Sequence, residues 1–330
     1  MGLQVKEYDL GCLLATTLVI ANRLIELKLA RDTGKPIDIK RKRPLPYLGD
    51  GIVAPLDAEI YPTYRCNHKC TFCSSGDRVF GTDDKQDLRR EFIDEIAERL
   101  NKVGLFNVGI VGGEPFLYPH LEQLIDALIA KGMHVYLTTN GSSSPDRIAA
   151  ICGSGLHLAV SVHSDGPEEN DRLTGRAGSF LRAIQTINLL VRKSIPVRII
   201  SVIETPSVEK IRKLAKRWAD LGVAEMTFCR VIKTGKARQY NMDAWDAESI
   251  IRLETMFDDV AGECRIKIHT GLPFRLSVSP DNQRAPFYMK YGNRCDAGIR
   301  GLYVAPSGDV YPCELLAREK YKLGNLLSDE

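Results

Sequence analysis

Short apolar runs alternate with amphipathic segments through most of this chain, beginning near residue 57. The apolar runs have the length of strands and cover 57–64, 107–111, 133–138, 157–162, 197–203 and 224–230. Between them, apolar residues recur at helical spacing over 84–102, 118–131, 144–153, 178–192 and 207–221. This alternation predicts an α/β protein built from repeated βα units with a parallel sheet. Six such strands joined by right-handed crossovers predict an open, partial (βα)6 barrel.

Further segments flank this predicted barrel and divide the chain into three parts: 1–56, 57–237 and 238–330. Residues 9–32 carry apolar side chains at nearly helical spacing and predict an N-terminal helix. A connector at 38–49 follows, with four consecutive basic residues and two prolines. It is either a solvated linker or a contact for a leader peptide or an anionic substrate. Beyond the barrel, residues 247–258 predict a helix and residues 265–269 an extended segment.

The composition is typical of a folded cytoplasmic protein. Hydrophobic residues make up 44% of the 330 residues, and the net charge of +3 requires neither nucleic acid nor a membrane as a partner. The nine cysteines are an odd number spread along the chain, unlike the disulfide framework of a small secreted protein. The apolar run at 10–21 is too short to span a bilayer, and no signal-peptide pattern is present.

Three cysteines lie within eight residues directly after the first predicted strand, in the pattern Cys66-x3-Cys70-x2-Cys73. Cysteine thiolates are the usual ligands of iron–sulfur clusters, and three ligands leave one iron of a four-iron cluster without a protein partner. A zinc site that includes His68, or a disulfide pair, is the alternative interpretation of this loop.

This spacing, with Phe72 before the third cysteine, resembles the signature of radical S-adenosylmethionine (SAM) enzymes. The resemblance covers roughly residues 55–235 and implies a [4Fe–4S] cluster held by Cys66, Cys70 and Cys73. In that family the open iron binds SAM, and reductive cleavage yields a 5′-deoxyadenosyl radical that abstracts hydrogen from a substrate. An external electron donor such as flavodoxin or ferredoxin is implied as a partner.

The loops that follow later strands carry the expected SAM contacts, because chemistry in such barrels lies beyond the carboxyl ends of the strands. Paired glycines allow close approach of the backbone to a ligand, and a carboxylate accepts hydrogen bonds from an ammonium group. The segment Gly112-Gly113-Glu114 is therefore similar to the family's loop for the amino group of SAM. By the same resemblance, we expect Ser161 and Arg172 to contact the ribose or carboxylate of SAM and Phe72 its adenine side. Around His163 the sequence departs from the family pattern by one position.

A hairpin near the C-terminus carries two further cysteines. Alternating apolar residues flank the turn residues 306–309, and this pattern brings Cys295 and Cys313 to neighbouring positions at the base of the hairpin. The spacing resembles the start of a SPASM or twitch extension, which implies one or two auxiliary [4Fe–4S] clusters; a zinc hairpin is the alternative. Since two cysteines do not fill a four-iron site, we expect further ligands beyond residue 330 or a contribution from Cys264.

One more cysteine lies near the end of the sixth predicted strand. Cys229 is either a small buried residue or a thiol that returns hydrogen to a substrate radical, as an epimerase requires. Cys264 is a second candidate for that role.

The sequence leaves three functions open. The leading hypothesis is a radical SAM oxidoreductase or epimerase that modifies a ribosomally made peptide or another natural product. A dehydrogenase or epimerase of a small sugar-like, aminoglycoside or nucleoside substrate is the alternative, and a non-catalytic iron–sulfur or zinc scaffold is the third.

Overall fold

A computed structural model describes seven stretches of the chain: 57–76, 87–105, 107–152, 156–241, 245–270, 297–298 and 301–328. The predicted N-terminal helix, the connector and Cys295 lie outside these residues.

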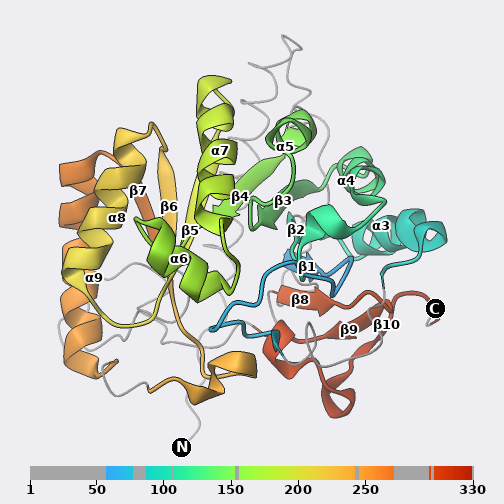
Figure 1. Ribbon diagram of the computed structural model, residues 1–330. Coiled ribbons are helices and arrows are strands. Elements are labelled where there is room, and N and C mark those ends of the chain that lie inside the picture. The colour runs from blue at the N-terminus through green and yellow to red at the C-terminus, as the bar shows by residue number, and fades with distance from the viewer. Residues whose placement is uncertain are drawn as a thin grey trace, which may run out of the picture.

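All six predicted strands form, and they pair in parallel in chain order. They are β1 (Asp57–Ile60), β2 (Asn107–Ile110), β3 (His134–Thr139), β4 (His157–Ser161), β5 (Val197–Ile203) and β6 (Glu225–Arg230). The predicted helices lie between them as α3 (Ile93–Lys102), α4 (Leu121–Ala130), α5 (Pro145–Cys152), α7 (Ser179–Arg192) and α8 (Val208–Asp220). These helices cover the outer face of the curved sheet (Figure 1). The predicted α/β partial barrel is therefore confirmed.

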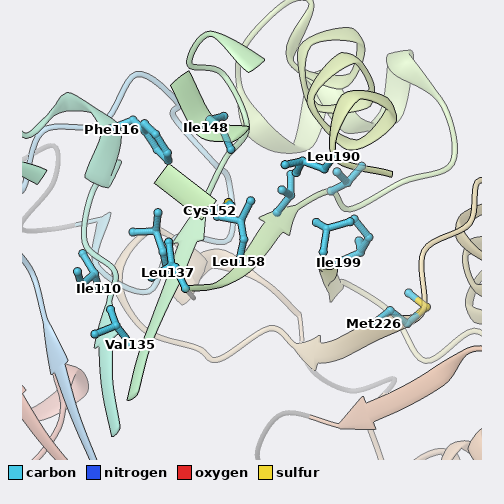
Figure 2. Packing of buried hydrophobic residues seen from close by; sticks show 14 of the residues in the cluster. Ile110, Phe116, Val135, Leu137, Ile148, Cys152, Leu158, Leu190, Ile199 and Met226 are labelled. Atoms are coloured by element: carbon cyan, nitrogen blue, oxygen red, sulfur yellow. The ribbon is translucent and has the colours of Figure 1, made fainter. Parts of the chain in front are cut away.

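Alternation along the strands decides which side chains face the helices. Val135 and Leu137 of β3 are buried in the layer between sheet and helices, together with Leu158 of β4 and Ile199 of β5 (Figure 2). Since side chains on a strand alternate, the intervening positions face the interior of the barrel. Tyr136 is one of them.

The sheet continues beyond the six predicted strands at both edges. The predicted helix at 247–258 is the longer α9 (Ala247–Cys264), and β7 (Lys267–Thr270) follows it and pairs in parallel with β6. On the other side, β8 (Gly301–Val304) and β9 (Asp309–Tyr311) form the predicted hairpin, with β10 (Gly324–Asn325) beside β9. The sequence did not show that β8 pairs in parallel along β1.

A short helix, α6 (Pro167–Thr174), was also missed by the sequence analysis. Pro167 is its first residue, where the missing N–H costs nothing, and Gly175 ends it in a left-handed conformation with φ 62°. Only one turn separates α6 from α7, so the two helices together make one βα crossover.

Candidate active site

The cysteine loop lies at the carboxyl edge of the sheet and is held there by its neighbours. The backbone N–H groups of Lys69 and Thr71 donate to the carbonyl oxygens of Thr174 and Leu173 at the end of α6, over 2.8 and 2.9 Å. From the other side, Lys236 N–H donates to Cys73 O over 3.0 Å. Lys236 belongs to the 3-10 turn η3 (Gly235–Gln239) that follows β6. Parts of the chain far apart in sequence thus fix both halves of the loop.

Two glycines allow this close packing. A β-carbon at Gly113 would collide with the carbonyl group of Arg65, directly before Cys66. A β-carbon at Gly235 would collide with the carbonyl oxygens of Cys73 and Ser74, and its φ of 52° also favours glycine. The Gly-Gly segment after β2 therefore packs on the cysteine loop, a contact that the sequence analysis did not predict.

The three thiols are half-buried and form no disulfide. Burial raises the pKa of Cys66 to about 12, and the negative charges of Glu114 and Cys73 act in the same direction. Burial, followed by the charges of Cys66 and Cys73, also raises the pKa of Cys70. Thiolates so close together need a compensating cation, and an iron–sulfur cluster supplies that positive charge. The donor set therefore fits the cluster that the resemblance implies.

A single zinc ion fits this loop less well. The ring nitrogen Nε2 of His68 is hydrogen-bonded to Ser142 Oγ over 2.8 Å, and burial lowers the pKa of His68 to about 4. Across the stretches that the structure describes, no three His, Cys, Asp or Glu side chains converge on one metal position.

Glu114 is buried, with 1% of its surface exposed, and its carboxylate is fully engaged inside the protein. Oε1 accepts from Thr139 Oγ1 over 2.7 Å and from Phe116 N over 3.2 Å, while Oε2 accepts from Asn140 N over 2.7 Å. Burial raises the pKa of Glu114, and these three hydrogen bonds oppose the rise. The carboxylate thus ties the Gly112-Gly113 loop to the turn after β3, a role that the sequence analysis did not foresee.

That turn supplies a residue that the sequence analysis missed. Asn140 Nδ2 donates to Asn67 Oδ1 over 2.7 Å, and its side chain also hydrogen-bonds the thiol of Cys66. The sequence feature that could have indicated Asn140 is its place in the Thr-Thr-Asn-Gly segment, at the end of a predicted strand.

Arg176 contacts the cysteine loop, a role that the sequence analysis did not assign to it. Arg176 Nη1 donates to Asn67 O over 2.7 Å. Arg172, predicted to contact SAM, pairs with Glu204 over 2.8 Å, and 57% of its side chain is exposed. This ion pair engages the guanidinium of Arg172 in the described structure.

Ser161 and Phe72 lie where a ligand beside the loop would contact them. Ser161 is the last residue of β4 and shares the interior face, because Leu158 and Val160 fill the opposite face. The ring of Phe72 packs edge-on against His163, with the ring centroids 4.6 Å apart. His163 Nδ1 accepts from Val202 N over 3.1 Å, and burial lowers the pKa of His163 to about 3. The neutral imidazole therefore supports Phe72 and the end of β5.

Cys229 faces the interior of the barrel. Its neighbour Phe228 points the other way and stacks on Phe257 of α9, with ring centroids 5.7 Å apart. Cys229 is half-buried and lies opposite Val202 on β5. Thr227, two positions before Cys229 on the same strand, therefore faces the interior as well. The sequence alone did not show which face these two residues share.

Cys264 lies apart from the cysteine loop, and its roles as hydrogen donor or auxiliary-cluster ligand stay predictions. It is the last residue of α9, in the outer layer of the fold. Burial raises the pKa of Cys264, and the nearby charges of Glu263, Lys216 and Arg212 also act on it. A helix that leads into a parallel strand ends at the amino edge of the sheet. The cysteine loop lies at the opposite, carboxyl edge.

Cys313 follows β9 and precedes the 3-10 turn η4 (Glu314–Leu316). Gly298 N–H donates to Pro312 O over 3.0 Å, so the chain just after Cys295 lies beside the residue just before Cys313. This contact is consistent with the predicted proximity of the two cysteines, although Cys295 itself is outside the described residues.

Comparisons with known proteins show what this chain is similar to. A model described as the radical SAM superfamily matches residues 60–217. The subtilosin biosynthesis protein AlbA of Bacillus subtilis is 27% identical over 83% of this chain and 58% of its own length. The mycofactocin maturase MftC of Mycolicibacterium smegmatis is 28% identical over 87% of this chain and 72% of its own.

The fold is shared with SuiB of Streptococcus suis bound to SAM. The TM-score is 0.72 at 20% identity, over 85% of this chain and 65% of SuiB. A second SuiB structure, bound to the precursor peptide SuiA, gives a TM-score of 0.70 at 19% identity, over 95% of this chain and 76% of SuiB. This chain thus spans less than two thirds of AlbA and of SuiB in its complex with SAM.

Residues 60–217 thus match the radical SAM superfamily, and the hairpin predicted from the SPASM/twitch resemblance is present as β8 and β9. Proteins of this family are enzymes that use a [4Fe–4S] cluster and SAM. Within the described stretches, no helix is both long and apolar enough to cross a bilayer.

Proposed function

We propose that this protein is a peptide-maturing enzyme, which abstracts hydrogen from a C–H bond of a ribosomally made peptide. The cysteine loop carries the proposal, because Cys66, Cys70 and Cys73 lie together at the carboxyl edge of a parallel sheet, where enzymes of this architecture carry out their chemistry. AlbA acts in the biosynthesis of a bacteriocin, and SuiB has been captured with a precursor peptide. Those two relationships favour a peptide over a sugar or a nucleoside.

The predicted residues other than Glu114 and Arg172 have a place in this proposal. Cys66, Cys70 and Cys73 hold the cluster that cleaves SAM. The Gly112-Gly113 backbone and Ser161 contact the amino acid part and ribose of SAM, and Phe72 its adenine side. Asn140 and Arg176 join this set because both bind the cysteine loop directly. An external flavodoxin or ferredoxin supplies the electron, and Cys295 and Cys313 belong to an auxiliary cluster.

The test is anaerobic reconstitution of the chain followed by incubation with SAM, a reductant and candidate substrates. The candidates are peptides encoded beside the gene and, in parallel, sugar, aminoglycoside and nucleoside precursors. We expect deoxyadenosine to form and the mass of one peptide to change. Modification of a small molecule with no peptide modified would contradict the proposal, and no deoxyadenosine under any condition would indicate a non-catalytic scaffold.

The fate of the substrate radical depends on Cys229 in our proposal. If the net reaction is epimerisation, Cys229→Ala should stop product formation while deoxyadenosine still forms, because the thiol that returns hydrogen is gone. Cys229→Ser is the matched variant, since a hydroxyl is close to a thiol in size but has a much stronger bond to hydrogen. Solvent deuterium in the product of the unmodified enzyme completes the measurement. Full turnover by Cys229→Ser would exclude the thiol and favour an oxidative reaction instead.

A further inference from the structure

The catalytic cysteine loop and the C-terminal hairpin are joined through a single carboxylate. Ser74 and Ser75 directly follow Cys73, and Glu314 directly follows Cys313. Ser74 Oγ donates to Glu314 Oε1 over 3.0 Å, and Ser75 Oγ donates to the same oxygen. Hydrogen bonds to a carboxylate are stronger than those between neutral groups, so the two serines bind the Glu314 side chain strongly. It connects residues 239 positions apart in the chain.

The surroundings make the link rigid at both ends. Tyr61 Oη is hydrogen-bonded to Ser75 Oγ over 3.3 Å, and Tyr61 N–H donates to Val304 O over 2.9 Å. Tyr64 Oη and Tyr303 Oη are hydrogen-bonded over 2.7 Å. The hairpin is therefore held against β1 by backbone hydrogen bonds and by buried tyrosines. Because this interface is tightly packed, a movement of the hairpin also displaces its neighbours on β1.

Glu314 reaches the cysteine loop through both serine hydroxyls. The carbonyl oxygen of Cys73 accepts from Gly76 N and Lys236 N, and both donors belong to the barrel part of the chain. Ser74 also lines a small cavity with Leu315, Ala317 and Arg318 of the segment that follows Cys313. A change in the position of Cys313 therefore has a direct polar route to the catalytic loop through the Glu314 carboxylate.

We propose that Glu314 is a positioning residue that couples the site at Cys313 to the catalytic cysteine loop, so that a change at Cys313 alters SAM binding at the other loop. Coupling of this kind is a free energy shared between two sites, and it requires an element in contact with both. This inference is independent of the substrate and holds whether the protein modifies a peptide or a small molecule.

The experiment uses the reconstituted full chain, with SAM as the probe. The Kd for SAM and the change that SAM causes in the electron paramagnetic resonance spectrum of the reduced cluster are measured in each variant. Glu314→Ala should weaken SAM binding about tenfold and reduce the spectral change, because the loop loses two hydrogen bonds to a charged group and only part of that loss is transmitted to SAM. Glu314→Gln keeps an acceptor oxygen for both serines and should restore most of the binding. Glu319→Ala, an exposed residue of the same extension, is the control and should behave as the unmodified protein.

A double-mutant cycle separates coupling from a general structural role. Cys313→Ala should weaken SAM binding in the unmodified chain and have little effect in the Glu314→Ala background. Equal effects in both backgrounds, or no effect in the unmodified chain, would overturn the proposal. It would also be overturned if Glu314→Ala matched Glu319→Ala in both measurements.

Discussion

Cys66→Ala is expected to eliminate SAM cleavage, with deoxyadenosine falling to the level of a reaction without protein. Three thiols hold the cluster, and two remaining ligands do not retain a four-iron site. The loop is also fixed from α6 and η3, so Cys70 and Cys73 cannot move together to compensate. Iron and sulfide per chain should fall by about four each. Chromatography of the reaction products and metal analysis after anaerobic reconstitution provide the measurement.

Cys264→Ala is the matched control for this experiment. It removes a thiol of similar exposure from the outer end of α9, far from the carboxyl edge of the sheet. It should retain both its iron and its SAM cleavage. Loss of cleavage in both variants would indicate that any thiol substitution damages the protein, and retained cleavage in Cys66→Ala would contradict the assignment of the cluster.

Glu59→Gln should stabilise the cluster-free protein at alkaline pH and leave it nearly unchanged at acidic pH. Glu59 lies on the interior face of β1, since Ala58 and Ile60 face the helices. Burial raises its pKa to about 7, and the negative charges of Glu314 and Asp57 act in the same direction. Tyr61 and Tyr136 face the same group, and its charge contributes to raising their own pKa values.

The sign of the effect follows from proton linkage. The folded state holds the Glu59 proton more tightly than the unfolded chain does. The stabilisation is therefore complete below about pH 4.5 and is lost as the pH rises through about 7. Glutamine does not titrate, so its advantage appears only above that range. Because Glu59 is partly exposed, we expect a difference of about 1–3 kcal/mol near pH 8 in the free energy of unfolding and little difference near pH 4.5.

Urea unfolding at the two pH values measures this difference. Gln123→Ala, an exposed position of α4 with no titratable group, serves as the control and should change the stability equally at both pH values. The same stability change for Glu59→Gln at both pH values would show that the carboxyl group does not titrate as described.

The barrel could be predicted from the sequence because its strands are buried on one face and separated by strongly amphipathic helices. That signal is local, and the boundaries of β2 to β6 fall within a residue or two of the predicted ranges. The cysteine loop was equally visible, since its ligands are adjacent in sequence. The sequence also indicated the hairpin, because the turn residues at 306–309 lie between alternating apolar residues.

What the sequence could not reveal depends on contacts between distant residues. The pairing of β8 with β1 involves two strands from opposite ends of the described chain, and neither strand specifies its neighbour. Glu114 has a motif position typical of a ligand contact, and only the fold shows three internal donors around its carboxylate. Arg172 lies in the last turn of α6, and Arg176 follows the end of this helix. Only the fold shows that Arg176 reaches Asn67 while Arg172 pairs with Glu204.

The place of β1 inside the sheet has a consequence for the order of events during synthesis. β1 carries the cysteine loop and is flanked by β2 on one side and β8 on the other. Tyr303 of β8 bonds Tyr64 from 239 residues further along the chain. Until the ribosome has made that segment, the outer edge of β1 exposes unpaired backbone groups, a common starting point for aggregation. Chaperone protection of that edge, and insertion of iron only after the C-terminal strands have docked, would give the nascent enzyme its safest route to maturity.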